Sequence, residues 1–296
     1  MTFSAVVGAG ATGLALARLL ADSGERVRLI TRSGSGPEHA GIERVAADAT
    51  VLDRLSELVQ GATTLYNCAM PPYNRWPTDW PPLAAALLGA AERTGTDYVM
   101  LGNVYGYGPV DGPMTEDHPL APTTVKGSVR AQMWLDASAS GVRVTEVRAS
   151  DFLGAGAMSA YNLLVPPAVL AGFAAAYPGD LDVEHSWTYV VDAARTMIAA
   201  ARHPGAWGRG WHVPSTSTLP VRALTTALAA AARAPYPQLA AMPVAELERD
   251  PIMAELIEMQ YLTRRPLLLD STHTSDVLGV TATPLEAVLT ETVTGR

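Results

Sequence analysis

Two cations stand four residues apart in the stretch TTVKGSVRAQ: Lys126 and Arg130. On a helix, this spacing places both side chains on one face, one turn apart. Like charges at that spacing repel each other, and residues 127–135 contain no carboxylate that could pair with them. The pattern predicts that both side chains face a negative or electron-rich group from elsewhere. The alternative is that both lie on a solvated outer face of the helix.

A second pattern that could do chemistry is the glycine spacing in VVGAGATGLALA. It follows an apolar run at 3–7 and opens a helical pattern, inside a strand–helix–strand unit. In that context the spacing indicates a dinucleotide-binding loop, because the glycines allow a tight turn, close approach of the pyrophosphate and close helix packing. The helix N-terminus then faces the anion. A glycine-rich turn without a ligand is the alternative. The residues expected to hold the dinucleotide here are Gly8, Gly10, Ala11, Thr12 and Gly13.

The residues after the next apolar run indicate which dinucleotide is preferred. An NAD site usually has Asp or Glu about twenty residues after the glycines, where it binds the ribose 2′-OH. Here Thr31, Arg32 and Ser33 occupy that place. Because a guanidinium matches phosphate geometry, Arg32 and Ser33 favour NADP(H) over NAD(H). A solvated surface arginine is the alternative. Asp48 ends the third predicted strand and is placed to accept from the adenine amino group.

Strand and helix patterns alternate along the first 150 residues. Apolar runs predict strands at 3–7, 27–30, 43–47, 64–68, 98–101 and 143–148, and helical periodicity predicts helices over 14–21, 52–60, 83–94 and the segment carrying Lys126. This alternation predicts an α/β fold with a Rossmann-type doubly wound parallel sheet. Prolines and glycines then interrupt the pattern, which indicates a smaller C-terminal substrate-binding lobe over the carboxyl edge of the sheet. We expect the dinucleotide-binding domain to comprise 1–151 plus about 186–215, and the lobe about 152–185 and 216–296.

Composition excludes several classes of partner. The 296-residue chain has a net charge of −8 and a pI near 5.2, so we expect no nucleic-acid partner, which would need a basic face. One cysteine, Cys68, excludes an internal disulfide framework and fits a reducing compartment. The N-terminus has no basic region followed by a separate apolar region, so we read no signal peptide and expect a cytoplasmic protein.

The sequence also argues against a membrane span, a metal site and hydrolase chemistry. Residues 152–179 carry no charge, but adjacent prolines at Pro166 and Pro167 would break a membrane-spanning helix. We therefore expect a buried loop-and-helix segment that lines a pocket, and no membrane partner. The six histidines show no metal-ligand spacing, and no Gly-x-Ser-x-Gly elbow occurs, so we expect neither a metal site nor hydrolase chemistry.

Several short motifs in order now carry a resemblance to a known family. These motifs are spread along nearly the whole chain. In order, they are the glycine loop GAGATG, YNCAMPP, VYGYGP with MTEDHPLAP, VRASDFLGAGA, WTYVVDAARTMIAA and LLLDSTHTSDVLGVTATPLEAV. The chain resembles an extended, atypical short-chain dehydrogenase/reductase of the NAD-dependent epimerase/dehydratase type. The resemblance implies that Cys68, Ala69 and Ala149 border the cofactor. It also implies a homodimer as one expectation, since relatives often pair through two helices flanking the active site.

The chain departs from the family at the catalytic positions. The family's helix carries Tyr-x-x-x-Lys, and the aligned positions here are Lys126 and Arg130; the family's Ser or Thr falls on Leu101. The resemblance places Lys126 and Arg130 against the cofactor. Arg130 could donate to the ribose hydroxyls but cannot shuttle protons. Partial desolvation beside Arg130 would make Lys126 release a proton more readily, or Lys126 could stay charged and stabilise an oxyanion.

Tyrosines are candidates to replace the missing proton donor. Asn103, Tyr105 and Tyr107 follow a predicted strand in LGNVYGYGP, and cations near either phenol would lower its pKa. The alternative is that both rings pack in the loop. Residues 71–82, PPYNRWPTDWPP, show no helix or strand period and are expected to form a substrate lid with Tyr73 and Trp76, or else an exposed structural loop.

The leading hypothesis is an NADP(H)-dependent reductase of a small, apolar or aromatic carbonyl, enone or imine. Asp151 and His185 fall in segments that line the pocket in relatives, so the pair is expected to act as acid and base or to position the substrate. One alternative is a non-redox isomerase, cyclase or lyase on the same scaffold. The other is a catalytically inactive dinucleotide sensor that binds a partner protein.

Overall fold

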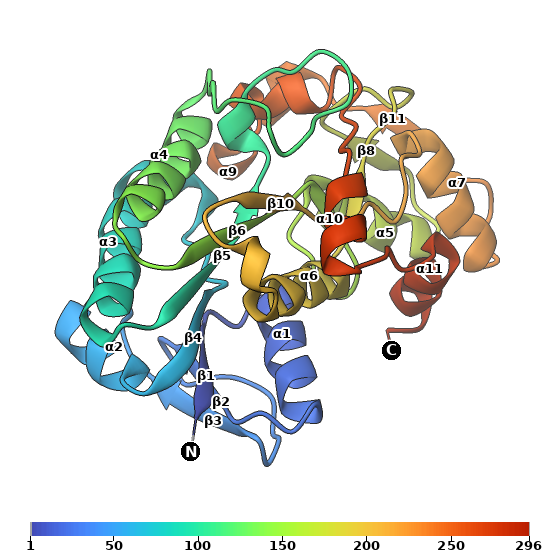
Figure 1. Cartoon of the computed structure of the whole chain (residues 1–296). Helices are drawn as coiled ribbons and strands as arrows, with labels where there is room; N and C mark the ends of the chain where they lie inside the picture. Colours follow the sequence, from blue (N-terminus) through green and yellow to red (C-terminus); the bar gives the residue numbers. More distant parts are fainter. Residues whose placement is uncertain (1, 296) are drawn as a thin grey trace.

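The fold is built around one parallel sheet. In the computed structural model, which describes residues 2–295, seven strands pair in the order β10-β6-β5-β4-β1-β2-β3. Figure 1 shows the sheet extending from β10 and β6 near the centre of the molecule to β2 and β3 at its lower end. Their bounds are β1 (Phe3–Val7), β2 (Val27–Thr31), β3 (Ile42–Ala46), β4 (Ala62–Asn67), β5 (Asp97–Asn103), β6 (Val144–Ala149) and β10 (Gly210–His212). The Rossmann-type doubly wound sheet predicted from the alternating pattern is confirmed.

Helices cover both faces of this sheet. On one face, α1 (Ala11–Asp22) and α6 (Val190–Arg202) pack on the strands through a core that includes Leu16, Leu20 and Met197. On the other, α2 (Leu52–Val59), α3 (Trp76–Thr94) and α4 (Val125–Ala139) bury residues such as Leu55 and Leu87. Figure 1 shows α3 and α4 side by side at one edge of the molecule. The central strands β1, β4 and β6 lie between the two layers and are mostly buried, as is typical of a parallel sheet, whereas the edge strand β3 is largely exposed.

The remaining elements form the smaller lobe. It contains α5 (Ala160–Leu170), α7 (Val221–Ala231), α11 (Leu285–Thr294) and two short sheets, in which β7 (Asp151–Leu153) pairs with β9 (Trp187–Tyr189) and β8 (Ala175–Tyr177) with β11 (Leu239–Ala241). A chain of short elements follows: α8 (Val244–Leu247), α9 (Pro251–Ala254), the 3-10 helix η4 (Ile257–Leu262) and α10 (Thr272–Leu278). The lobe has a hydrophobic core of its own, and Figure 1 shows α9 close to α4. The domain limits given above remain a prediction.

The segment 71–82 differs from its prediction. After a short 3-10 helix, η1 (Tyr73–Arg75), α3 begins at Trp76 rather than at Leu83. Pro77 sits in the first turn, where a missing N–H costs little. Pro81 and Pro82 do remove backbone hydrogen bonds, but Trp76 and Trp80 are buried one turn apart and anchor this part of the helix. The prediction of an irregular loop is therefore wrong from Trp76 onward.

A second difference concerns the uncharged segment 152–179. The helix α5 runs through Pro166 and Pro167, where the sequence predicted a break. Burial of Tyr161, Val165 and Val169 in the core of the lobe offsets the lost backbone bonds. The segment contains the expected loop and helix, but strand residues of β7 and β8 lie at its two ends, and Met158, Leu163 and Phe173 are exposed, so the prediction that it is buried is wrong for these side chains. Within residues 2–295 no helix is long and apolar enough to span a membrane.

Candidate cofactor and substrate site

A cleft of about 530 Å³ opens at the carboxyl ends of β1, β2 and β4. Parallel sheets of this topology bind ligands at this edge. Seven of the predicted cofactor residues, which follow the first four strands, lie in its wall: Gly8, Gly10, Arg32, Ser33, Asp48, Cys68 and Ala69. The cleft thus brings together residues that are far apart in the sequence.

The glycine loop has the geometry that a bound pyrophosphate requires. Gly8 has a φ of +101°, and a Cβ there would lie 2.5 Å from the carbonyl oxygen of Cys68. A Cβ on Gly13 would lie 2.1 Å from the carbonyl oxygen of Gly8. Gly10, in contrast, faces open space, since a Cβ there would meet no atom within 4 Å. No side chain caps the start of α1, so its backbone N–H groups are left for a ligand in the cleft. The residues therefore fit a dinucleotide.

The adenosine end of the cleft carries Arg32, Ser33 and Asp48. Arg32 is exposed, and the hydroxyl of Ser33 donates to that of Ser35 at 3.0 Å. Asp48 Oδ1 accepts from the backbone N–H and the hydroxyl of Thr50, and these bonds, together with the more distant charge of Arg32, hold its pKa below the usual range. Asp48 is therefore a fixed anion in the wall that the adenine would contact.

The other residues expected to border the cofactor contribute backbone. Burial raises the pKa of the Cys68 thiol to about 12, and its Sγ lies 4.0 Å from the sulfur of Met197. The thiol is therefore neutral and packed. Ala149 is fully buried at the end of β6, where it pairs in register with Asn103 of β5. Neither side chain offers a polar atom to a ligand.

Lys126 is held by carboxylates of the smaller lobe. Its side chain is 1% exposed, and its Nζ donates to Oε1 of Glu258 at 2.6 Å and to the carboxylate of Glu255. The same ammonium lies 4.6 Å from the centre of the Tyr73 ring. The side chain of Lys126 thus lies between two carboxylates and the face of an aromatic ring. The negative groups that face Lys126 thus come from residues more than a hundred positions away.

Arg130 points into the protein. Its Nη2 donates to the carbonyl oxygen of Leu101, and its guanidinium lies 5.0 Å from the ring centre of Trp80 and 6.0 Å from that of Trp76. Its Nε is buried and has no hydrogen-bond partner within residues 2–295. Arg130 thus braces α4 against α3 and the end of β5. Its predicted contact with the cofactor ribose stays a prediction.

Tyr73 and Tyr105 meet beside Lys126, with their hydroxyl oxygens 3.5 Å apart. Burial raises the pKa of both phenols, and the nearby carboxylate of Asp151 raises both further. The expectation that cations would lower the pKa of Tyr105 is wrong, because burial outweighs the charge of Arg130. Asn103 uses its side-chain oxygen to accept from the backbone N–H of Tyr105 at 3.1 Å, which fixes the turn after β5.

Tyr107 lies in a different place from Tyr105. Its hydroxyl accepts from Nη1 of Arg148 at 2.7 Å and lies 2.8 Å from Nε2 of His212. Arg148 in turn donates to Glu146 at 2.7 Å. Burial raises the pKa of Tyr107 to about 12, although Arg148 opposes the shift, so the expected lowering is wrong here too. Protein groups therefore satisfy the hydrogen bonds of this hydroxyl without a substrate. The catalytic role of Tyr107 stays a prediction.

Asp151 and His185, paired in the sequence analysis, are in contact. Nε2 of His185 lies 2.9 Å from Oδ2 of Asp151. The imidazole is buried against the ring of Trp187, while Asp151 is partly exposed, so the histidine fixes the carboxylate from behind. Trp76 is buried and gives its Nε1–H to the carbonyl oxygen of Pro71, which leaves Tyr73 as the partly exposed aromatic ring of the predicted lid.

The site can now be compared with known proteins. A model of the NAD dependent epimerase/dehydratase family matches residues 5–213. The chain belongs to the NAD dependent epimerase/dehydratase family. A comparison with curated proteins finds no match. The replacement of the family's Tyr, Lys and Ser or Thr by Lys126, Arg130 and Leu101, expected from the order of the motifs, stays a prediction.

Solved structures with the same fold cover nearly the whole of this family member. UDP-glucose 4-epimerase from Thermotoga maritima, solved with UDP-glucose, is 16% identical with a TM-score of 0.81 over 99% of this chain and 98% of that one. A dTDP-glucose 4,6-dehydratase from Bacillus anthracis, in complex with NAD, is 16% identical with a TM-score of 0.81 over 99% and 96%. The enzyme WbmH from Bordetella bronchiseptica, in complex with NAD+, is 18% identical with a TM-score of 0.79 over 99% and 98%. At these identities the likeness shows the fold.

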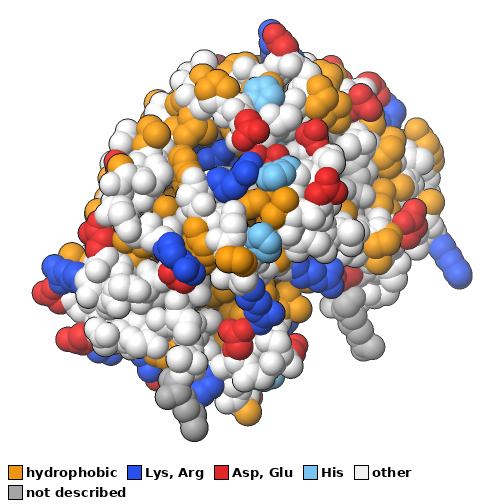
Figure 2. All heavy atoms as spheres, viewed as in Figure 1, with side chains coloured by type: hydrophobic (Ala, Val, Ile, Leu, Met, Phe, Trp, Pro, Cys, Tyr) orange, Lys and Arg blue, Asp and Glu red, His pale blue; other side chains and the backbone are white. Residues whose placement is uncertain are grey.

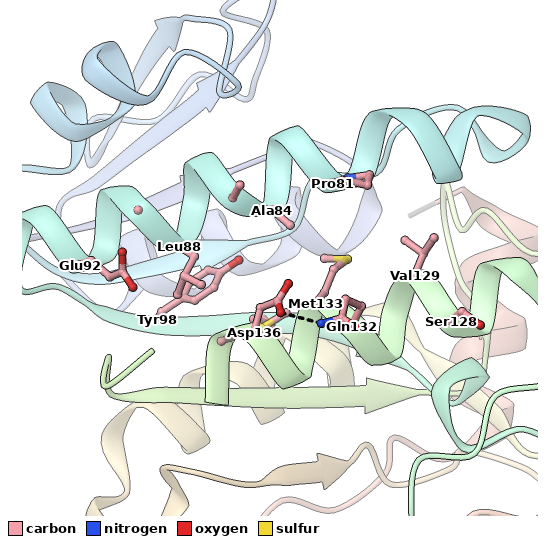
Figure 3. A pocket seen from close by; sticks show the side chains of 14 residues that line it. Pro81, Ala84, Leu88, Glu92, Tyr98, Ser128, Val129, Gln132, Met133 and Asp136 are labelled. Carbon is pink, nitrogen blue, oxygen red and sulfur yellow. Dashed lines mark hydrogen bonds between the residues drawn. The ribbon is translucent and has the colours of Figure 1, made fainter. Parts of the chain in front are cut away.

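A separate groove lies between α3 and α4, away from the cofactor cleft. It measures about 610 Å³, and Figure 3 shows Leu88, Val129 and Met133 among its apolar side chains, with Gln132 hydrogen-bonded to Asp136 at 2.7 Å. None of the predicted site residues lines this groove. A homodimer through these two helices stays a prediction.

The sequence analysis missed three residues of this site. Glu255 and Glu258 bind Lys126, and the signal was their three-residue spacing in AELIEMQ, which puts two carboxylates on one side of a turn. Tyr177, at the end of β8, lies near Asp151 and had no local signal. Within residues 2–295 no group of three His, Cys, Asp or Glu side chains could hold a metal ion. Figure 2 shows acidic and basic side chains interspersed on the face that it draws.

Proposed function

We propose that this member of the family is an NADP(H)-dependent reductase of a small, apolar or aromatic carbonyl, enone or imine. The observation that carries the proposal is the glycine loop, in which Gly8 and Gly13 are packed against backbone while Gly10 leaves room for a ligand. Arg32 in the same cleft supports the choice of NADP(H), because an arginine there can hold a 2′-phosphate. The nicotinamide, when bound, supplies or accepts a hydride.

Different residues of the chain would bind the dinucleotide and contact the substrate. Asp48 and the loop from Gly8 to Gly13 would hold the adenosine and the pyrophosphate. Tyr73, Tyr105 and Trp76 form an aromatic cluster, with the rings of Tyr73 and Trp76 5.0 Å apart and those of Trp76 and Tyr105 5.9 Å apart. This cluster lies beside Lys126 and suits a small, flat substrate. Both phenols keep their protons at neutral pH, so either can donate a hydrogen bond to a substrate oxygen.

The proposal is tested by the absorbance of NADPH at 340 nm with a panel of aliphatic and aromatic carbonyls, enones and imines. We expect consumption of NADPH with at least one class of the panel. Tyr105→Phe should lower kcat more than tenfold if its hydroxyl contacts the substrate, and Asp276→Asn, on the exposed face of α10, serves as the control. No consumption of NADPH across the panel would contradict the proposal.

A second function is favoured by one observation. Lys126 and Leu101 replace the hydroxyl-bearing residues of the family, which removes the usual route for a proton in net reduction. A non-redox isomerase, cyclase or lyase on the same scaffold is consistent with that loss. Conversion of a substrate by the dinucleotide-loaded protein without any change at 340 nm would support this second function over the first.

A further inference from the structure

The first turns of α3 form one wall of the proposed dinucleotide cleft. Arg75, the residue just before the helix, lines the cleft together with Asp79 and Leu83. These three residues are four apart in sequence, so they share one face of the helix. Ala84 and Leu88 lie on the opposite face and line the separate groove beside α4, as Figure 3 shows. The inference below rests on the proposed function, because it concerns the cofactor of that same site.

The backbone of Arg75 is fixed where the helix begins. Its N–H donates to the carbonyl oxygen of Pro72 at 2.8 Å. The next residue, Trp76, is buried and its indole N–H donates to the carbonyl oxygen of Pro71 at 3.2 Å. A second buried ring, that of Trp80, anchors the following turn. The helix therefore presents the side chain of Arg75 to the cleft from a fixed point.

The guanidinium of Arg75 is held along one edge and open along the other. Oδ1 of Asp79 accepts from its Nη2 at 2.9 Å and from its Nε at 3.2 Å, and the hydroxyl of Thr78 donates to the same oxygen at 3.0 Å. Within residues 2–295 no hydrogen bond involves Nη1 of Arg75, and 63% of the side chain is exposed. An exposed ion pair of this kind contributes little to stability. A guanidinium with one free edge is, however, well suited to donate to phosphate oxygens.

The order of the strands places Arg75 and Arg32 on opposite sides of the glycine loop. Strand β1 lies between β2 and β4 in the sheet, and all three are parallel. Arg32 follows β2, the loop from Gly8 to Gly13 follows β1, and the segment that carries Arg75 follows β4. A dinucleotide lies across the carboxyl ends of such strands with its pyrophosphate at the glycine loop. Arg75 thus approaches the pyrophosphate from the side away from the ribose 2′-position.

The charges of the cleft support the same placement. Its wall contains four charged side chains, Arg32, Asp48, Arg75 and Asp79. The carboxylate of Asp79 alone would repel a pyrophosphate, and Arg75 neutralises it while keeping a free donor. We propose that Arg75 is a cofactor-binding residue whose guanidinium donates to the pyrophosphate of the bound dinucleotide. Since NADP(H) and NAD(H) share this group, Arg75 sets the affinity for both, whereas Arg32 chooses between them.

The test is calorimetric titration of the full chain with NADPH and with NADH. Arg75→Ala should weaken binding of both at least fivefold, and the two losses should agree within a factor of two. Arg54→Ala is the matched control, because Arg54 is also exposed and paired with a carboxylate one turn away, that of Glu57, but lies on α2 outside the cleft wall. We expect this control to bind both dinucleotides within twofold of the wild type.

A double variant separates a lost contact from a changed charge. Arg75→Ala alone leaves the carboxylate of Asp79 without its partner, and that carboxylate would repel the pyrophosphate. Arg75→Ala combined with Asp79→Ala removes one charge of each sign, so the net charge equals that of the wild type. We expect the double variant to bind both dinucleotides at least threefold more weakly than the wild type. Wild-type affinity of the double variant would overturn the inference, because the loss would then come from the freed carboxylate.

The possible results separate this inference from the proposed function. Unchanged binding of NADPH and NADH by Arg75→Ala would overturn the inference and leave the proposed function intact. A loss for NADPH alone would place Arg75 at the 2′-phosphate and overturn its assignment to the pyrophosphate. Failure of the wild type to bind either dinucleotide would overturn the proposed function and the inference with it. If Arg75→Ala does not fold, Arg75→Met, which keeps the alkyl stem, replaces it with the same expected loss.

Discussion

Nζ of Lys126 donates a 2.6 Å hydrogen bond to Oε1 of Glu258, so a carboxylate of the smaller lobe holds the lysine that is predicted to stand at the family's tyrosine position. Glu255 binds the same ammonium. The two carboxylates are partly exposed, whereas Lys126 is buried. The contact therefore joins the two lobes through one buried cation. Its contribution to the free energy of unfolding depends mainly on whether that cation keeps a counter-charge.

The two sides of this contact should respond differently to substitution. Glu255→Gln with Glu258→Gln leaves a buried ammonium without a counter-charge, which should lower the free energy of unfolding by about 3 kcal/mol. Lys126→Met leaves carboxylates that can be hydrated, so its loss should be smaller. Urea denaturation measures both, and the triple variant should regain most of the stability of the wild type. A larger loss for Lys126→Met than for the double variant would contradict this account of the contact.

Tyr107 should matter for stability rather than for catalysis. Tyr107→Phe removes the hydroxyl that accepts from Arg148 and bonds to His212, and it leaves both groups buried with one partner fewer. We expect a loss of about 1–3 kcal/mol in the free energy of unfolding. Dinucleotide affinity, measured by fluorescence titration, should change by less than twofold. Unchanged stability together with lost turnover would instead support the proton-donor role expected from the sequence.

Substitutions of two glycines in the loop should have separate effects, one on stability and the other on dinucleotide binding. Gly13→Ala places a Cβ 2.1 Å from the carbonyl oxygen of Gly8, so it should lower the melting temperature by several degrees. Gly10→Ala meets no atom within 4 Å and should fold normally, but its methyl group occupies space left for the pyrophosphate. We expect Gly10→Ala to weaken dinucleotide binding more than tenfold at an unchanged melting temperature. Normal binding by Gly10→Ala would place the dinucleotide elsewhere.

The pattern of the sequence was sufficient for the sheet and the glycine loop, because both depend on local signals. Apolar runs, glycine spacing and the strand–helix alternation are all contained within short windows. The pairing of Asp151 with His185 was also expected, from the resemblance rather than from spacing. The prolines led to wrong predictions of helix breaks in both lobes. The sequence does not show that Trp76, Trp80 and Tyr161 are buried, and this burial offsets the lost backbone hydrogen bonds.

The environment of the candidate catalytic residues could not be predicted for a different reason. The partners of Lys126 come from a segment more than a hundred residues away. The pKa of the Tyr105 phenol is set mainly by burial rather than by its neighbours in the sequence. A sequence shows charges and their spacing, but the pKa of a buried group depends on desolvation, which is a property of the packed structure. The substrate side of the site was therefore the part least accessible to sequence analysis.

Arg32 should determine the choice of dinucleotide. It stands where an NAD site carries an acid, and its guanidinium is free to hold a 2′-phosphate at the exposed end of the cleft. Arg32→Ala should weaken NADPH binding at least tenfold, or about 1.4 kcal/mol, and leave NADH binding within twofold. Arg54→Ala, which removes an exposed arginine from α2, is the matched control. Equal losses for NADPH and NADH would mean that Arg32 does not contact the 2′-phosphate.

The most direct measurement is a titration of the purified protein with NADPH, NADP+, NADH and NAD+, followed by quenching of tryptophan fluorescence. The account predicts saturable binding, with NADPH bound at least tenfold more tightly than NADH. Tighter binding of NADH would keep the dinucleotide site and contradict the role of Arg32. Binding of none of the four would contradict the central claim that the cleft beside Gly10 holds a dinucleotide.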